Sequence, residues 1–494
     1  MRSAPARSPF AIPLMVIVLF TAACVPMSSP SVPLAPPAIA AIGTAPSKIA
    51  PGTSIVDVTT RTSGTSPTVA TWQYISGAES FNSRLDARLL SIFDARAGGR
   101  HEPAALPPTP AALLSDGVSV THEIILAAGS VVGARFVQTT MAGGVRTGLI
   151  DEITYEDLTT GVVTDSAGLI NPAMTGTLRT ILAEATEPST SVGDAAALTA
   201  GALPAVGLTA VGLTAIGFTA DGNLSVTLRH NSASGAELPH PVTVNLNAAT
   251  TAEVISPAGE SLRSAIIAKT PPAFPQPIPG GVEHIDCDLV ACAALTYDDG
   301  PNAQTTRLLG ILEKHNVFAT FFQQGGYVKA NPGVAASVAA AGHTIANHTM
   351  SHPYLTKLPP AGIQGEVRST QNAIEKATGV VPDYVRPPYG ATNKSVAASV
   401  GLPQILWDVD SLDWQSRNKA TFVPRVMSLV KPGSIILQHD VHASTVDGQA
   451  ELITQLKGRG FYLVTLPQLF AGIELTPGAS YKCRGSSPGC VPGR

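Results

Sequence analysis

The chain has 494 residues, of which 44% are hydrophobic and only 13% are charged, and its net charge is −4. This length exceeds one ordinary hydrophobic core and predicts two or three domains. No dense basic cluster is present, which argues against nucleic-acid binding, because that needs many lysines and arginines. With 45 glycines and 41 prolines, we expect long connectors between the domains.

Residues 1–24 have the order of a secretory signal: arginines, then an apolar stretch, then small residues. Arg2 and Arg7 precede Phe10–Phe20, which is too short for a comfortable transmembrane helix. The end of the segment resembles a bacterial lipoprotein cleavage box, although Thr21 stands where leucine is usual. We therefore expect Cys24 to carry a lipid that anchors the protein on the outer face of the cytoplasmic membrane. An ordinary cleaved signal and an uncleaved anchor are the alternatives, and all three predict export.

Residues 25–65 are rich in Pro, Ser, Ala and Thr and almost uncharged, which predicts an extended tether. The next segment, 66–268, has the mixed periodicities of an α+β domain. Its spacing predicts two helices, at Ala78–Ala97 and Leu178–Ala185. It predicts strands at Val118–Leu126, Val132–Met141, Ile150–Leu158, "NLSVTLRH" and "PVTVNL". A five-residue repeat over Ala205–Thr219 fits neither period, and we expect an irregular apolar loop or a distorted strand there.

Lys269–Gly281 contains five prolines in thirteen residues and is a linker, about 269–281. From 282 to 475 short apolar runs alternate with helical patterns. This alternation is typical of a parallel sheet, and so many repeats indicate an α/β fold of the barrel type. A C-terminal tail, 476–494, carries two cysteines.

Four cysteines remain apart from Cys24, namely Cys287, Cys292, Cys483 and Cys490. Export places them under oxidising conditions, so disulfides are expected rather than a metal cluster. Four cysteines allow three pairings, and the short local loops favour 287–292 and 483–490.

Polar residues follow several predicted strands of 282–475, at the point where each strand ends. They occur in "TYDDGP" (Asp298, Asp299), "HTMSH" (His348, His352), "RPPYG" (Arg386, Tyr389), "DSLDW" (Asp413, Trp414) and "LQHD" (His439). In a parallel barrel all strand C-termini open on one face, where active sites lie. We therefore expect these side chains to meet.

His348 and His352 are four residues apart, so both can face one ion, and one carboxylate of Asp298-Asp299 would complete a three-ligand set. Three protein ligands with open positions are typical of a catalytic metal site. Each motif alone is weak, since two solvated loop histidines or an ordinary Asp-Asp-Gly turn would look the same.

The five motifs together resemble, in order and spacing, those of the NodB-homology polysaccharide deacetylases, carbohydrate esterase family four. The resemblance covers about 200 residues. It implies a distorted (β/α) barrel and a divalent metal, usually zinc, bound by Asp299, His348 and His352. It makes Asp298 the general base, paired with Arg386. Tyr297 stands where phenylalanine is common.

The resemblance further implies that the backbone N–H of Tyr389 binds the oxyanion and that His439 is the general acid, charged by Asp413. Trp414 and Leu437 would line the pocket for the acetyl methyl group, although both could equally be core packing. Asp410 could simply satisfy loop backbone, and Asn347 could either orient the metal loop or merely cap it. His315, His343 and His442 have no partner motif and are expected to be ordinary surface or packing histidines.

Electrostatics favours this division of the two adjacent carboxylates, because both stay ionised only if each has a cation. The metal would serve Asp299, and Arg386 would serve Asp298. Amide hydrolysis needs activated water, a sink for oxyanion charge and a proton for the amine, and the set supplies all three.

We expect an exported polysaccharide N-deacetylase whose leading substrate is the N-acetylglucosamine of peptidoglycan. N-acetylmuramic acid, chitin oligomers and acetylxylan remain open, because the motifs define the chemistry and not the sugar. A non-catalytic wall-binding protein and a metal-dependent amidase acting on peptide cross-links are the rival classes. The 66–268 domain is a spacer, a wall-binding module or a regulator.

Overall fold

The computed structural model describes residues 39–43, 48–49, 54–107, 114–186, 216–228, 242–269 and 284–493. The chain divides into two units, Met1–Pro37 and Ala38–Arg494, and the description below concerns the second. The predicted signal with Cys24, nearly all of the proline-rich linker, and the repeat up to residue 215 lie outside the described residues. Within them, no helix combines the length and the apolar character that crossing a bilayer requires.

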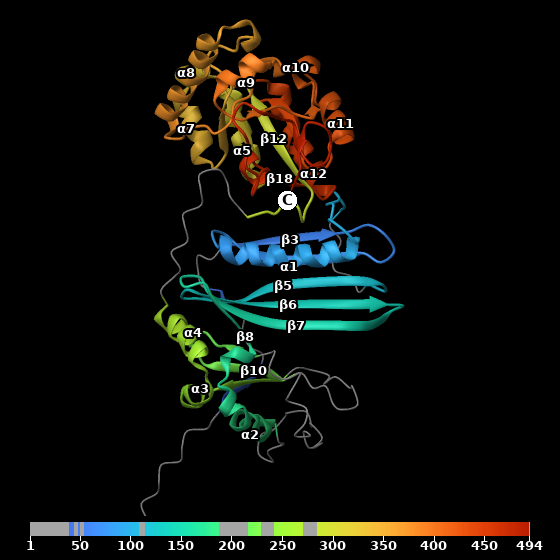
Figure 1. Cartoon of the computed structure of the whole chain (residues 1–494), viewed down its shortest axis with the longest axis vertical. Coiled ribbons are helices and arrows are strands. Elements are labelled where there is room, and N and C mark those ends of the chain that lie inside the picture. Colours follow the sequence, from blue (N-terminus) through green and yellow to red (C-terminus); the bar gives the residue numbers. More distant parts are fainter. Residues whose placement is uncertain are drawn as a thin grey trace, which may run out of the picture. The chain divides into compact units, whose positions relative to one another are not determined.

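The first sheet has the order β3-β4-β5-β6-β7-β8, with β2 beside β5. Its strands are β2 (Lys48–Ile49), β3 (Ile55–Arg61), β4 (Thr68–Ile75), β5 (Gly117–Ala128), β6 (Val131–Ala142), β7 (Val145–Asp157) and β8 (Val162–Asp165). Helix α1 (Glu79–Ala97) lies along this sheet in Figure 1, and its buried stripe includes Leu85, Leu89 and Phe93. The predicted helix and strands of this segment are confirmed.

A second, small sheet has the order β1-β11-β10-β9. It consists of β1 (Ile39–Gly43), β9 (Ile216–Phe218), β10 (Leu224–Leu228) and β11 (Val242–Leu246), with α2 (Thr175–Thr186), α3 (Ala248–Val254) and α4 (Pro257–Ala268). Tyr155 of β7 and Phe218 of β9 belong to one core cluster, so the two sheets share a core.

The predicted tether over 25–65 is wrong from residue 39 on, because β1, β2 and β3 lie within it and pair with strands of the two sheets. Strand β3 pairs antiparallel with β4, Arg61 opposite Val69 and Ile55 opposite Ile75. A boundary at residue 66 would therefore cut between two hydrogen-bonded strands. The alternation in "IVDVTTR" is short, and the surrounding Ser, Thr and Pro obscured it.

The region after residue 284 is a parallel sheet surrounded by helices, as Figure 1 shows around β12. Its strands are β12 (Cys292–Asp298), β13 (Thr320–Gln323), β14 (Thr344–Asn347), β15 (Gln404–Ile405), β16 (Val409–Asp410), β17 (Ser434–His439) and β18 (Tyr462–Val464). The helices are α5 (Ala303–Lys314), α6 (Gly325–Ala330), α7 (Pro332–Ala340), α8 (Pro360–Thr378), α9 (Lys394–Val400), α10 (Asp413–Ser416), α11 (Lys419–Leu429), α12 (Ala443–Gly458) and α13 (Leu466–Leu469).

Strand β12 is central and every residue in it is buried. One edge pairs with β17 along its length, and the other pairs with β18 at its start and β13 at its end. All these pairings are parallel, and single bridges through Val385 continue the sheet from β14 to β15. A buried strand of this kind lacks polar alternation, which is why it reads as a continuous apolar run. The predicted α/β barrel-type fold is confirmed.

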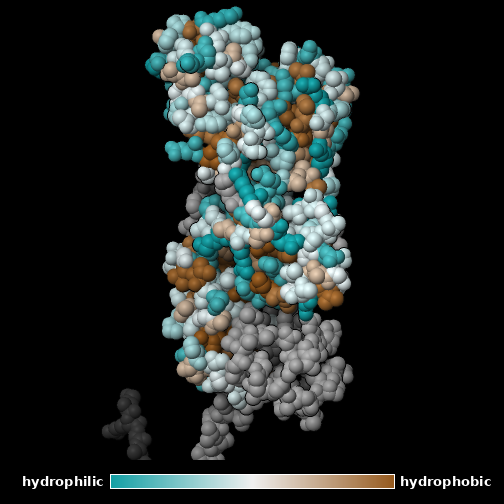
Figure 2. Space-filling view, turned by 45° about the vertical axis from the view of Figure 1, so that its right-hand side comes forward, coloured by the Kyte–Doolittle hydropathy of each residue, from teal (hydrophilic) through white to brown (hydrophobic). Residues whose placement is uncertain are grey.

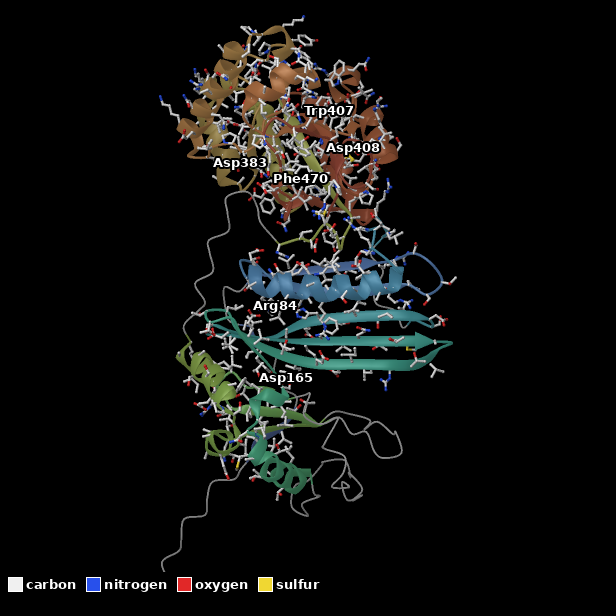
Figure 3. All side chains as sticks on the ribbon, viewed as in Figure 1. Arg84, Asp165, Asp383, Trp407, Asp408 and Phe470 are labelled. Atoms are coloured by element: carbon white, nitrogen blue, oxygen red, sulfur yellow. A yellow bond between two sulfur atoms is a disulfide. The ribbon has the colours of Figure 1, made fainter. Side chains whose placement is uncertain are left out.

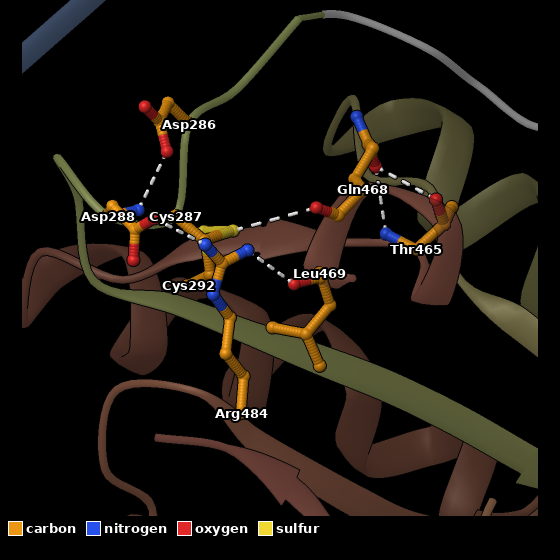
Figure 4. Close-up of a disulfide and its surroundings, with 8 residues drawn as sticks. All are labelled: Asp286, Cys287, Asp288, Cys292, Thr465, Gln468, Leu469 and Arg484. Atoms are coloured by element: carbon orange, nitrogen blue, oxygen red, sulfur yellow. Dashed lines mark hydrogen bonds and ion pairs between the residues drawn. A yellow bond between two sulfur atoms is a disulfide. The ribbon is translucent and has the colours of Figure 1, made fainter. Parts of the chain in front are cut away.

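The C-terminal tail belongs to this sheet. Strand β19 (Ser480–Tyr481) pairs with β15, β20 (Cys483–Arg484) pairs with β17, and β21 (Cys490–Val491) pairs with β20. The sulfur atoms of Cys287 and Cys292 lie at disulfide distance, as do those of Cys483 and Cys490, which are the two favoured pairings. Figure 4 shows Arg484 beside the first pair, donating to the carbonyl of Leu469 at 2.7 Å.

On the face that Figure 2 shows, hydrophobic residues form small separate patches among hydrophilic ones. Scattered apolar residues are normal on a folded surface. Two stretches of the chain nevertheless concentrate exposed side chains. One is aliphatic, with Val145 and Leu149 on β7 and Val162 on β8, and the other is aromatic, with Tyr354, Tyr389 and Trp414.

Candidate active site

The predicted convergence of the strand ends is what the structure shows. Asp298, the last residue of β12, lies opposite His439, the last residue of β17, in a parallel register. Strand β14 ends at Asn347, directly before His348. Because neighbouring parallel strands end on the same edge, residues from three distant parts of the chain lie side by side there.

Asp299, His348 and His352 each present one ligand atom, and these three atoms lie within 4.8 Å of one another. Nε2 of His348 is 3.6 Å, and Nε2 of His352 is 3.4 Å, from the same carboxylate oxygen of Asp299. These separations allow one ion to contact all three groups. Two imidazoles and one carboxylate form a donor set that suits zinc, with further positions left open.

The surroundings of His348 prepare it as a ligand. Its Nδ1 lies 2.8 Å from the carbonyl oxygen of Arg386, so Nδ1–H donates there and the lone pair of Nε2 faces Asp299. Burial lowers the pKa of His348 to about 3, which keeps the ring neutral. A neutral, oriented imidazole is the form that binds a metal.

Asp298 pairs with Arg386 as predicted. Nη1 of Arg386 donates to one carboxylate oxygen of Asp298 at 2.7 Å, and the other oxygen lies 3.7 Å from Nε2 of His348. Both residues are buried, and burial raises the pKa of Asp298 while the charge of Arg386 acts in the opposite direction. Arg386 also donates to Thr296 and to two backbone carbonyls, which satisfies its buried guanidinium.

His439 and Asp413 form the second charged pair. Nδ1 of His439 lies 2.9 Å from Asp413, whose other oxygen accepts from the His439 backbone N–H at 2.8 Å. Burial alone would lower the pKa of His439, but the hydrogen bond and charge of Asp413 outweigh it and raise the pKa to about 9. The imidazolium is therefore the stable form at neutral pH, with Nε2–H as its remaining donor.

Tyr389 has a left-handed backbone conformation, with φ 62°. It lies beside the three candidate metal ligands Asp299, His348 and His352, referred to below as the metal group, since its ring meets the ring of His352 edge-on at 4.6 Å between centroids. Gly390 follows, also left-handed, and a Cβ there would come within 3.1 Å of the Trp407 ring. Trp407, labelled in Figure 3, thus leaves no room for a side chain at this position of the turn.

Strain is concentrated around this edge of the sheet. Among the described residues eight non-glycine residues have positive φ, and five of them, Asp299, Thr349, His352, Tyr389 and Leu412, lie on loops that carry predicted site residues. Such conformations cost free energy and persist where the surroundings impose them.

Leu437 and Trp414 are placed differently from each other. Leu437 is 3% exposed and lies opposite Thr296 on β12, on the face of the sheet that Asp298 and His439 share. Trp414 is 47% exposed and directly follows Asp413 in α10. For the described residues, the structure gives no contact of either side chain with the metal group, so their role as a methyl pocket stays a prediction.

Several supporting residues were not predicted from the sequence. Glu366 of α8 accepts from the backbone N–H groups of Met350 and Ser351 at 2.8 and 2.9 Å, and so ties down the loop between the two histidines. Asn347, which could have been a cap or an orienting residue, accepts from the Thr349 N–H and donates to Val367 of α8. It therefore does orient this loop.

Asp440 is the last residue of the motif "LQHD", and the sequence pattern alone assigns it no role. It is buried, and it accepts from the Gly300 N–H at 3.1 Å and from the Thr305 hydroxyl at 2.5 Å. Burial, with the charges of Asp299 and Asp298, raises its pKa to about 7. A Cβ on Gly300 would collide with this carboxylate, which explains the glycine after the two aspartates.

Tyr297, which stands where the family commonly has phenylalanine, is accommodated because its hydroxyl forms a hydrogen bond. The hydroxyl of Tyr297 donates to Gln449 of α12 at 2.7 Å, on the face of the sheet turned away from Asp298. Asp410 accepts from the Leu412 N–H at 2.9 Å, so it satisfies loop backbone, as its simpler interpretation predicted.

A family model described as polysaccharide deacetylase matches residues 287–405. A chitooligosaccharide deacetylase of Rhizobium leguminosarum bv. trifolii is 37% identical over 193 residues, covering 35% of this chain and 89% of that protein. The chain belongs to the polysaccharide deacetylase family.

Two longer relatives are similar over the same part of the chain. The peptidoglycan-N-acetylglucosamine deacetylase PgdA of Listeria monocytogenes is 40% identical over 189 residues, which are 38% of this chain and 40% of that protein. The peptidoglycan-N-acetylmuramic acid deacetylase PdaC of Bacillus subtilis is 41% identical over 177 residues, 36% of this chain and 38% of that protein. The match thus spans about two fifths of these relatives.

Proposed function

We propose that this chain is an exported, metal-dependent hydrolase that removes N-acetyl groups from a cell-surface polysaccharide. The observation that carries the proposal is the grouping of Asp299, His348 and His352 within 4.8 Å, with Asp298 on one side of it. The rival wall-binding protein of the same fold would have lost a base, a ligand or an acid, yet each is present.

Each residue has a task that its surroundings support. Asp299, His348 and His352 would hold the ion, which when bound lowers the pKa of water and polarises an amide carbonyl. Asp298 accepts the proton of the attacking water, and Arg386 keeps its carboxylate oriented. The N–H of Tyr389 donates to the developing oxyanion, and His439 gives its proton to the departing amine.

We propose N-acetylglucosamine of peptidoglycan as the substrate. The relatives named above act on N-acetylglucosamine, N-acetylmuramic acid or chitooligosaccharides by their names, so the sugar must be tested directly. An N-terminal signal with Cys24 as a lipid-modified residue would place the enzyme at the envelope, next to that substrate. Loss of membrane association in Cys24→Ser would test the anchor.

The deciding experiment measures acetate released from peptidoglycan and from acetylxylan, with and without a chelator. We expect release from peptidoglycan that chelation abolishes and zinc restores. Asp298→Asn should lower kcat at least about 100-fold, because it removes the base. Circular dichroism must accompany it, since the change also leaves the buried Arg386 without its partner. Acetate release that survives this substitution would exclude Asp298 from the mechanism.

A further inference from the structure

The hydroxyl groups of five tyrosines differ in their surroundings. Those of Tyr74, Tyr297 and Tyr462 donate to groups of the protein and stabilise the fold. Those of Tyr354 and Tyr389 have no hydrogen-bond partner among the described residues, and these two residues are 43% and 56% exposed. Exposed aromatic rings with free hydroxyls are typical of binding surfaces rather than of packing.

The two exposed rings are stacked on each other beside the metal group. Their centroids lie 4.0 Å apart, and their planes differ by 15°. Tyr389 meets His352 at 4.6 Å, and His352 meets His348 at 4.9 Å. A continuous series of four rings therefore leads from the buried ligand His348 to the surface at Tyr354.

The stack is held in place before any ligand arrives. Tyr354 is followed by Leu355, which is fully buried in a cluster with Ile363 and Val385, so the neighbouring ring must point outward. Tyr389 is fixed by its left-handed turn. Pre-positioned rings cost a ligand little ordering entropy.

The exposed aromatic residues gather in one part of the chain. Among the described residues, the large exposed aromatic side chains are Tyr327, Tyr354, Tyr389 and Trp414, all in the deacetylase domain. The ammonium group of Lys357 lies 4.5 Å from the Tyr354 ring. Such an exposed contact is weak, and a ligand can displace the lysine from that ring.

A pyranose ring matches this surface, because its axial C–H groups form an apolar face and its hydroxyls surround that face. We propose that the Tyr354–Tyr389 stack binds the sugar unit next to the one that loses its acetyl group. The enzyme then selects linked sugars and favours longer chains over shorter ones. This inference rests on the proposed function, and it adds Tyr354, a residue outside the five motifs, to the substrate-binding surface.

The test compares kcat/KM for a pentamer of N-acetylglucosamine and for the monomer, which has no neighbouring sugar, in the wild type, Tyr354→Ala, Tyr354→Phe and the control Tyr327→Ala. We expect Tyr354→Ala to lower kcat/KM for the pentamer about tenfold, mainly through KM, and to change the monomer value less than about twofold. Tyr354→Phe keeps the ring and should stay within about threefold of the wild type. Tyr327→Ala should leave the ratio unchanged.

Three results would overturn the inference: an unchanged pentamer value in Tyr354→Ala, an equal loss for the pentamer and the monomer, or an equal change in the control. Pentamer binding by calorimetry in an Asp298→Asn background separates this inference from the proposed function. If the wild type releases no acetate from any substrate, the proposed function is wrong. Weaker pentamer binding after Tyr354→Ala would then still support the stack, and unchanged binding would refute it.

Discussion

Asp413 is saturated with hydrogen bonds, although it is fully buried and charged. It accepts from the backbone N–H and Nδ1 of His439 and from the hydroxyls of Ser411 and Thr445. Burial alone would raise the pKa of Asp413, but the hydrogen bond to His439 and the other donors lower it below the usual value. A fixed carboxylate of this kind orients His439 and keeps it positively charged.

Asp413→Asn should therefore weaken His439 as an acid at alkaline pH. A general acid works only while protonated, so activity is lost as pH rises through the pKa of His439, which is about 9. Without the carboxylate, this pKa should fall toward the ordinary value of about 6.5. The alkaline limb of the kcat/KM profile between pH 5 and 10 should move down by about two units. An alkaline limb at the wild-type position would show that Asp413 does not set the charge, and Asp410→Asn is the control.

Sequence patterns revealed Asp298 and His439 because each ends a strand whose apolar run is easy to see. Asp298 and His439 end β12 and β17, and both strands are almost wholly buried. Glu366 and Thr445 gave no such signal. They lie on amphipathic helices among other polar residues, and only the tertiary fold places them against the site.

At the scale of elements, helix α8 acts as the support of the metal loop. Glu366 in its second turn binds the backbone of residues 350 and 351, and the loop closes on His352 directly afterwards. Contacts of this kind, which hold the ligands without touching the metal, orient the ligands, and their loss commonly lowers metal affinity about tenfold or more.

Glu366→Ala should weaken zinc binding by about tenfold, because two backbone N–H groups of the loop lose their acceptor and His352 is no longer fixed. Competition with a chromophoric chelator measures this affinity without any substrate. Glu375→Ala is the matched control, since this glutamate is exposed on the same helix. Equal affinities of the wild type and Glu366→Ala would mean that the loop keeps its shape without α8.

Short elements are where the sequence failed. Strands β19, β20 and β21 have two residues each, too few for any period to be visible, so the tail was expected to be separate. Strand β3 was assigned to the tether for a related reason, because composition outweighed a seven-residue alternation. Helix α1 was predicted to within one residue at each end, whereas the longest strand, β7, begins at Val145, five residues before the predicted Ile150.

At the scale of the whole molecule, Asp288 joins three segments that are far apart in the sequence. It forms ion pairs with Arg100 at 3.1 Å and with Arg484 of the tail at 2.8 Å. Both Asp288 and Arg484 are buried, and the disulfide pair Cys287–Cys292 lies directly alongside. Losing Arg484 removes one of the two cationic partners of this buried carboxylate, and weakened compensation of a buried charge is destabilising.

Arg484→Met should therefore lower the stability of the deacetylase domain by about 3 kcal/mol. For a domain of this size, we expect the thermal midpoint to fall by about 6–12 °C in a calorimetric scan. The exposed neighbour Lys482→Met should not change the midpoint. A midpoint for Arg484→Met equal to that of this control would mean that the tail does not fasten the fold.

The edge-on contact between His352 and Tyr389 unites two tasks that are usually counted separately. An ion that immobilises this imidazole also immobilises the tyrosine whose amide is to meet the negative oxygen and whose ring is to meet carbohydrate. Removing the metal should thus weaken sugar binding as well as stop turnover. Polysaccharide affinity measured on the metal-free protein would then underestimate the affinity of the metal-bound enzyme.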